Sequence, residues 1–342
     1  GDGFWFAGGS NTDTNTICIA RSPHNMYTSG DTINTGNTHF YKAHSMSSYN
    51  SGTAVQDACE LADGSIVTVG HSWVTSGNPN YYFGYTSYVL KFNNDGTYNS
   101  SQSYQNNPYA GTSYSNGFQP QRIKQATNGN ILMVGWDAQD ASGYQPQAQL
   151  VLFDSSMTVL YKREIYPSGK SSTNALWSPQ QIEIADDGNF VVFFWDSNYD
   201  QFVIGKFDSS DLTDAGVPYL CGSGITTRAS MGTSSKAGKF VITVDRGSNE
   251  FAYTGTLDSW PLENLSDIFG SASATTWVDT GTSTFTASKG SGPSLSQSTY
   301  TPLDIYGNHS TQYGGDVNYF NVITTDYNYS SQITSNTNFT QL

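Results

Sequence analysis

The chain has 342 residues, of which 12% are charged and 14% aromatic, and its formal net charge of −14 gives a sequence pI of about 4.5. This acidity excludes nucleic acid and anionic membrane surfaces as partners, because both repel a polyanion. No apolar run approaches the roughly 20 residues needed to cross a bilayer, which excludes membrane insertion by a helix. The polar residues are mostly Ser, Thr, Asn, Gln and Gly, a surface common outside cells, so we expect an extracellular or virion-surface location.

One pattern recurs along the chain: a short strand, a turn ending in Gly, a hydrophobic strand, a polar loop, and a third strand that runs into an Asx or Ser turn. Aromatic and β-branched residues dominate the pattern, which favours strands over helices. The turn glycines recur at intervals of 50 to 65 residues, at Gly3, Gly64, Gly129, Gly188 and Gly238. Turns such as A-D-G and T-N-G are hairpin turns that need a positive φ.

In chain order, the first copy is DGFWFAGGSNTD with NTICIARSP, and it lacks the strand that precedes the glycine in the other copies. The second is VQDACELADG/SIVTVGHSW with YVLKFNNDG, and the third is QRIKQATNG/NILMVGWDAQD with QLVLFDSSM. The fourth is QQIEIADDG/NFVVFFWDSNYD with FVIGKFDSSD, and a weaker fifth is SSKAGKFVITVDRGSN with FAYTGTLDS. From about residue 260 the pattern loosens, and TTWVD, STFTAS and YTPLDIYG are strand candidates in a stretch rich in Ser, Thr and Gly.

Repeats of this length with three or four strands each predict an all-β fold, a single β-propeller domain over residues 1–342 with about six blades, within a range of five to seven. Regular blades occupy 1–260, and a degenerate blade and closing strands occupy 261–342. A β-solenoid would need shorter and stricter rungs, and a string of sandwiches should show linkers. Because the first copy lacks a strand, we predict that a segment within 318–334 pairs with the strand at 4–7 and closes the ring.

The phrases YVLKFNNDGTY, LVLFDSSMTVLY and VIGKFDSSD, which follow DGSIVTVG and NGNILMVG, resemble β-propeller repeats of bacteriophage virion proteins and of secreted bacterial proteins. In those repeats an L-x-K-x-D-S-x-G phrase ends one strand and a G-x-x-x-V-G strand opens the next. The resemblance covers residues 1 to about 260 and implies the propeller fold, with a phage tail or fibre as one setting. The sialidase box S-x-D-x-G-x-x-W is absent.

The loop after the hydrophobic strand carries aromatic and acidic residues in several copies. The candidate ligand-binding residues at this place are Trp73, Trp136, Asp137, Trp195, Asp196 and Asp245. Equivalent loops of successive blades lie side by side on one face of a propeller, so these side chains would form a ring there. Indole rings stack on sugars, and carboxylates accept hydrogen bonds from sugar hydroxyls. The alternative is that the tryptophans pack between blades.

Conventional catalytic motifs are absent, so we expect no catalytic residue, no metal and no cofactor. Asp57, Glu60 and Glu183 lie on the first strands, which line the axis of such a fold, and are candidates for a pair of glycosidase acids. Such a pair must lie about 5 to 10 Å apart across a cleft. The alternative is that they are ordinary acids of an acid-rich chain.

The histidines and cysteines do not show metal-site spacing. His39 and His44 are five residues apart in a strand-and-loop region, where no helical face brings them together. The three cysteines, Cys18, Cys59 and Cys221, have no C-x-x-C spacing, and we expect them to be buried as small apolar residues.

Three functions fit these observations. The leading hypothesis is a non-catalytic structural or receptor-contacting propeller of a virion or cell-surface assembly, with other virion or surface proteins as partners. The second is a secreted carbohydrate-binding propeller with a glycan as its ligand. The third is a polysaccharide-cleaving enzyme that uses axial carboxylates.

Overall fold

The computed structural model describes residues 4–9, 16–22, 40–47, 51–74, 84–105, 118–137, 148–170, 177–196, 201–222, 239–245, 250–256, 265–279, 288–291 and 294–297. Strands dominate these residues, and α1 (Leu265–Phe269) is the single helix among them. Within the same residues, no helix has the length and apolar character needed to span a membrane.

Five antiparallel sheets follow the five predicted copies in order, and we call them blades 1 to 5. Blade 1 contains β1 (Phe4–Gly9), β2 (Thr16–Ser22) and β3 (Phe40–Ser47), and blade 2 contains β4 (Ser51–Glu60), β5 (Ile66–Val74), β6 (Gly84–Phe92) and β7 (Tyr98–Gln105). Blade 3 contains β8 (Phe118–Gln125), β9 (Ile131–Asp137), β10 (Ala148–Phe153) and β11 (Val159–Pro167). Blade 4 contains β12 (Trp177–Ile184), β13 (Phe190–Asp196), β14 (Gln201–Phe207) and β15 (Tyr219–Cys221), and blade 5 contains β16 (Lys239–Asp245) and β17 (Glu250–Thr256).

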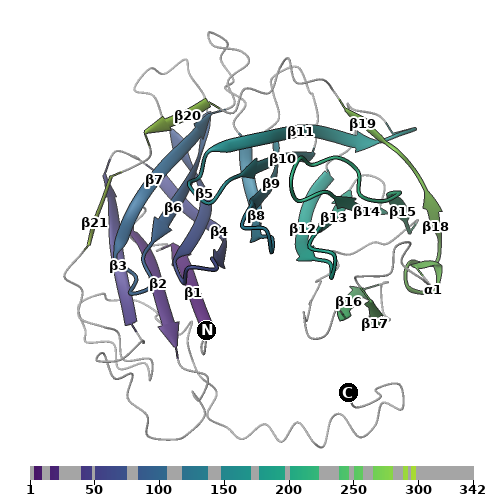
Figure 1. The fold of residues 1–342 in the computed structure, drawn as a ribbon, viewed down its shortest axis with the longest axis horizontal. Coiled ribbons are helices and arrows are strands. Elements are labelled where there is room, and N and C mark those ends of the chain that lie inside the picture. The colour runs from purple at the N-terminus through teal and green to yellow at the C-terminus, as the bar shows by residue number, and fades with distance from the viewer. Residues whose placement is uncertain are drawn as a thin grey trace, which may run out of the picture.

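The blades stand side by side around a common centre, with β4, β8 and β12 nearest to it, so the all-β fold is propeller-like (Figure 1). The turn between the first two strands has the same geometry in blades 2, 3 and 4. Gly64, Gly129 and Gly188 have φ values of 79°, 90° and 83°, as the turn sequences predicted. In each turn the glycine N–H donates to the carbonyl three residues earlier.

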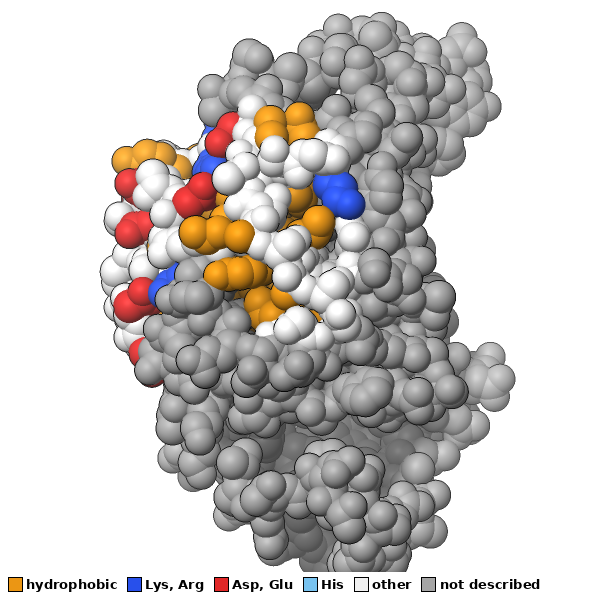
Figure 2. Space-filling model, turned by 90° about the vertical axis from the view of Figure 1, so that its right-hand side faces the viewer, with side chains coloured by type: hydrophobic (Ala, Val, Ile, Leu, Met, Phe, Trp, Pro, Cys, Tyr) orange, Lys and Arg blue, Asp and Glu red, His pale blue; other side chains and the backbone are white. Residues whose placement is uncertain are grey.

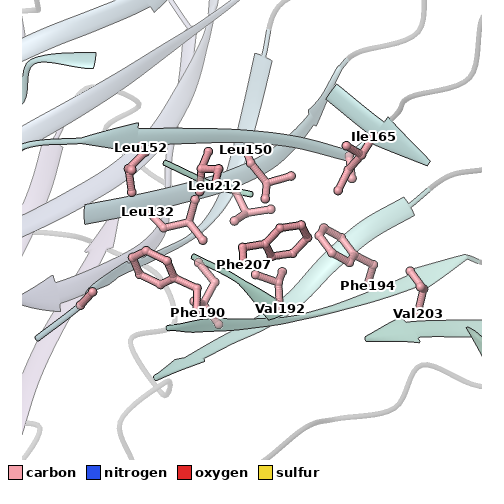
Figure 3. Close-up of a cluster of buried hydrophobic side chains, with 14 residues drawn as sticks. Leu132, Leu150, Leu152, Ile165, Phe190, Val192, Phe194, Val203, Phe207 and Leu212 are labelled. Carbon is pink, nitrogen blue, oxygen red and sulfur yellow. The ribbon is translucent and has the colours of Figure 1, made fainter. Parts of the chain in front are cut away.

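Buried side chains fill the spaces between neighbouring blades. Between blades 3 and 4, β9 and β10 contribute Leu132, Leu150 and Leu152, which face Phe190, Val192, Phe194 and Phe207 of the next sheet (Figure 3). A second cluster joins Val67, Val69 and Val89 of blade 2 to Met133, Val151 and Phe153 of blade 3. The near-continuous apolar central strands therefore arise because both of their faces are covered.

The described strands after residue 270 form no sheet of their own. Most of 261–342, where a degenerate blade is predicted, lies outside the described residues, so that blade stays a prediction. The described strands are β18 (Ala272–Ala274), β19 (Trp277–Asp279), β20 (Ser288–Ser291) and β21 (Ser294–Gln297). Each joins the outer edge of a different sheet, in the order blade 4, blade 3, blade 2 and blade 1 (Figure 1). These four strands, which we call the belt, therefore follow the periphery backwards. Strands of three or four mostly small polar residues cannot build a core, but they can pair with an open edge.

Two side chains fasten the belt between blades 3 and 4. The indole of Trp277 stacks on Phe207 with 5.8 Å between ring centroids and packs edge-on against Phe194 at 5.7 Å. A Cβ added to Gly205 would lie 2.6 Å from the Trp277 ring, so this glycine makes room for the indole. On β11, Arg163 donates to both carboxylate oxygens of Asp279 at 2.9 and 3.0 Å.

The first described strand of blade 1 is β1. In the described residues β1 pairs with β2 alone, and β1 packs beside β4 of the next blade. The segment 318–334, predicted to pair with β1, lies outside the described residues, and so does Gly238. The ring closure stays a prediction.

Candidate functional site

The candidate ligand-binding residues can be compared between blades by counting residues from the turn glycine. Trp136 and Trp195 each follow that glycine by seven residues and end β9 and β13 at equivalent places. The matching residue of blade 2 is His71, because Trp73 lies nine residues after Gly64. The circle of aromatic residues expected from the sequence therefore combined residues at non-equivalent positions of the blades. The sequence interpretation missed His71, which is the blade 2 residue equivalent to Trp136 and Trp195.

Trp195 is a packing residue between blade 4 and α1. It is 9% exposed and belongs to a buried cluster with Phe193, Phe202, Ile204, Cys221, Leu265 and Phe269. Trp136 is half-buried at the equivalent place, opposite Gln119 and Ala148 of its own sheet. Of these two indoles, only that of Trp136 has a substantial surface for a ligand.

The other four predicted residues are placed by backbone register. Trp73 pairs with Ser51 and Tyr85 in blade 2. At the ends of their strands, Asp137 pairs with Phe118, Asp196 with Trp177 and Gln201, and Asp245 with Glu250. The three aspartates are the last residues of their strands and Trp73 is the last but one of β5, whereas the sequence predicted all four in the following loop. Their side chains lie outside those described. Their role in ligand binding stays a prediction.

The axial acids tie neighbouring inner strands together. The Asp57 carboxylate on β4 accepts a hydrogen bond of 2.9 Å from the Ile123 N–H of β8. Burial raises the pKa of Asp57, against the lowering effects of that hydrogen bond and of nearby Arg122 and Lys124. A raised carboxyl pKa is what a general acid requires, but here the carboxylate already binds a strand backbone.

Glu183 of β12 is only 2% exposed. Lys124 of β8 approaches it at 3.3 Å, and Gln181 donates to its other oxygen at 3.1 Å. Glu183 and Asp57 stand on blades 4 and 2, with β8 of blade 3 packed between β4 and β12. Both acids therefore engage groups of β8, the inner strand of the blade between them.

A repeated β-bulge marks the inner strands and was not anticipated. Gln56, Gln121 and Gln180 are the extra residues in β4, β8 and β12, each eight residues before the turn glycine. Arg122 donates to the Gln121 carbonyl at 2.7 Å and to the Gln180 carbonyl at 2.6 Å, which joins two bulges. The recurring Gln at a constant distance from the glycine was the available signal.

Metal-binding groups do not gather in the described part of the chain, where no cluster of three or more His, Cys, Asp or Glu residues occurs. Cys221 is buried and Cys59 packs against the cluster between blades 2 and 3. Burial raises the pKa of the Cys59 thiol to about 12. A thiol of this kind stays protonated and is a poor nucleophile or metal ligand at neutral pH.

Comparison with known proteins assigns no activity to the chain. No protein-family model matches it, and no curated protein matches it. One similar solved structure is a GH43 β-1,3-galactosidase in complex with galactodeoxynojirimycin. The match has a TM-score of 0.40 and 13% sequence identity, and covers 65% of this chain and 76% of the galactosidase chain.

Proposed function

We propose that this chain is a non-catalytic propeller that serves as a structural or receptor-contacting part of a virion or another extracellular surface assembly. The observation that carries the proposal is the engagement of the axial acids. Asp57 holds the backbone of the next blade, and Glu183 is buried beside Lys124. Acids held in this way link neighbouring blades, and this role supports a non-catalytic function.

The character of the surface also supports the proposal. The described side chains on one flank are largely uncharged, with hydrophobic side chains in the middle and acidic ones toward one edge (Figure 2). Leu160 and Tyr161 of β11 and Val217 are the large hydrophobic residues exposed in the described part, at 41, 48 and 52%. Belt strands cover the outer edges of four sheets, which limits edge-to-edge association in a crowded assembly.

Fractionation tests the assembly proposal. Antibodies against the chain should label purified particles or the surface of the producing cells, in a constant ratio to a known structural component. The proposal fails if the protein occurs in quantity only as a free molecule in the culture supernatant.

An activity assay tests the non-catalytic part separately. The intact protein should release no reducing ends from host polysaccharides. Glu183→Gln and Asp57→Asn should lower stability, because each weakens a link between blades. Polysaccharide cleavage that is abolished by either substitution, in a variant that remains folded, would make the chain a glycosidase instead.

Glycan binding is a second candidate, favoured by the half-buried indole of Trp136. Stacking on a sugar ring contributes about 0.5 to 1.5 kcal/mol, so Trp136→Ala should weaken binding to a glycan array about threefold or more. Tyr161→Ala is the matched control, since it removes an exposed aromatic residue from another strand. Unchanged binding in Trp136→Ala would eliminate this candidate.

A further inference from the structure

Three buried polar residues lie on the facing sides of blades 2 and 3, toward one end of the space between them. His71 and Ser87 are direct partners on β5 and β6, and strand alternation puts them on the face that carries Val69 and Val89. Gln149 of β10 shares the opposing face of blade 3 with Val151 and Phe153. All three polar side chains are buried, with 9, 0 and 0% exposure.

The next blade interface has apolar residues at the same positions. Counting from the turn glycines, His71 and Ser87 correspond to Trp136 and Ala148 of blade 3. Gln149 corresponds to Val203 of blade 4. Ala148 and Val203 pack in the cluster between blades 3 and 4. The interface between blades 2 and 3 thus differs at three neighbouring positions at once, and His71 is smaller than the indole it replaces.

Of these three polar residues, Gln149 is the one whose side-chain amide needs a hydrogen-bond partner. Neither its amide nitrogen nor its amide oxygen has a hydrogen-bond partner in the part of the chain that the structure describes, although the side chain is fully buried. A buried amide without hydrogen bonds costs several kcal/mol, and such groups in proteins are almost always satisfied by protein or by ordered water. A valine here, as in blade 4, would carry no such cost.

We propose that the His71–Ser87–Gln149 position is a buried binding site for a neutral hydroxyl group, which accepts from the Gln149 amide nitrogen and donates to its amide oxygen. A water molecule or a hydroxyl of a small polyol such as a monosaccharide supplies this chemistry. Buried waters make about three hydrogen bonds, and three polar side chains face this space.

Charge favours a neutral ligand. Glu164, half-buried on β11, is the register partner of Gln149, so an anion would be repelled. Burial lowers the pKa of His71 to about 4, and the same loss of hydration disfavours any cation placed beside it. The site and the proposed function stand independently, because the site lies inside the ring and not on its surface.

The test compares the intact protein with Gln149→Met, which keeps the side-chain length and removes both amide atoms. Val203→Met is the matched control at the equivalent buried place on blade 4. Thermal melting is measured in buffer and with increasing glycerol and D-glucose, and a crystal structure is determined at a resolution that shows ordered water.

With a bound hydroxyl, Gln149→Met melts at a lower temperature than the intact protein and loses the density beside residue 149. If the hydroxyl belongs to a polyol, glycerol or glucose raises the melting temperature of the intact protein in a saturable way, beyond its general effect on Gln149→Met. If it belongs to water, the two proteins respond equally and the crystal shows a water in hydrogen-bond distance of the amide. A more stable Gln149→Met protein, with no density beside Gln149 in the intact one, overturns the proposal.

Discussion

At the scale of single residues, the turns of the blades contain residues with a positive φ, and these residues differ in what surrounds them. Gly129 has a φ of 90° with open space where a Cβ would point, whereas a Cβ on Gly188 would lie 2.6 Å from the hydroxyl of Thr127. Met157 and Leu212 have φ values of 64° and 62° in later turns, and both side chains are buried. Burial of a large apolar side chain offsets the strain in those turns.

The two glycines should therefore respond differently to alanine. Gly129→Ala should cost about 1 kcal/mol from the left-handed backbone alone, and Gly188→Ala should cost more, because Thr127 must also move. Urea unfolding of both variants measures the difference. The extra cost should disappear in a Thr127→Ala background, and its persistence there would contradict the clash.

The buried His71 predicts a loss of stability in mild acid. Its pKa is lowered from 6.5 to about 4 by burial, so the unfolded chain binds the proton more tightly. The contribution is complete above pH 6.5 and is lost as the pH falls from 6.5 to about 4, by roughly 3 kcal/mol. Chemical unfolding across this range measures it. His71→Gln should flatten that part of the profile, and an unchanged slope would assign the effect to other groups.

At the scale of elements, two residues that lie side by side in each blade vary together between blades. Two blades carry an ion pair between the residue before the turn glycine and the third strand: Lys91 with Asp63 at 3.4 Å, and Lys206 with Asp187 at 2.7 Å. Blade 3 has Leu152 and Asn128 at these two places, so charge is present on both or on neither.

This coupling predicts that Lys206→Leu is tolerated. The lysine side chain is 5% exposed and the Asp187 side chain 47%, so a leucine can pack while water solvates the carboxylate. The cost should stay below about 1 kcal/mol, whereas Lys206→Ala should cost more because it leaves a cavity. Equilibrium unfolding compares them, and equal losses would show that the ion pair and not the buried stem stabilises the strand.

The attachment of the belt to blade 4 depends on the space that Gly205 leaves for the Trp277 indole. Gly205→Ala would place a Cβ against the Trp277 ring, so it should release the belt from blade 4 and cost about 1 to 3 kcal/mol. Limited proteolysis should then cut the belt faster than it does in the unaltered protein. In a Trp277→Ala background the cost should fall but not vanish, because the added Cβ would also lie 2.9 Å from the Phe207 ring. An unchanged cost there would show that the clash with Trp277 does not contribute.

At the scale of the whole molecule, closure depends on the inner edge of β1, which no described strand covers. We still expect a segment within 318–334 to pair with β1, and deletion of residues 318–342 should then unfold the ring in one cooperative step at a much lower temperature. The loss of a strand and a buried face is comparable to the stability of a domain. An unchanged melting transition in the truncated protein would leave closure to the belt and the blade contacts.

The local pattern of the sequence was enough to predict the blades. The order of strands and the glycine turns at Gly64, Gly129 and Gly188 depend on short-range alternation and on a positive φ, which neighbouring residues alone encode. Only the tertiary structure decided the rest. The belt strands became visible only beside the edges that they cover. The role of Trp195 depends on its contact with α1, and that of Gln149 on its burial between blades. Contacts between residues far apart in the chain leave no periodic trace in either partner, which is why the paths of the belt and the roles of the buried polar groups had to come from the folded molecule.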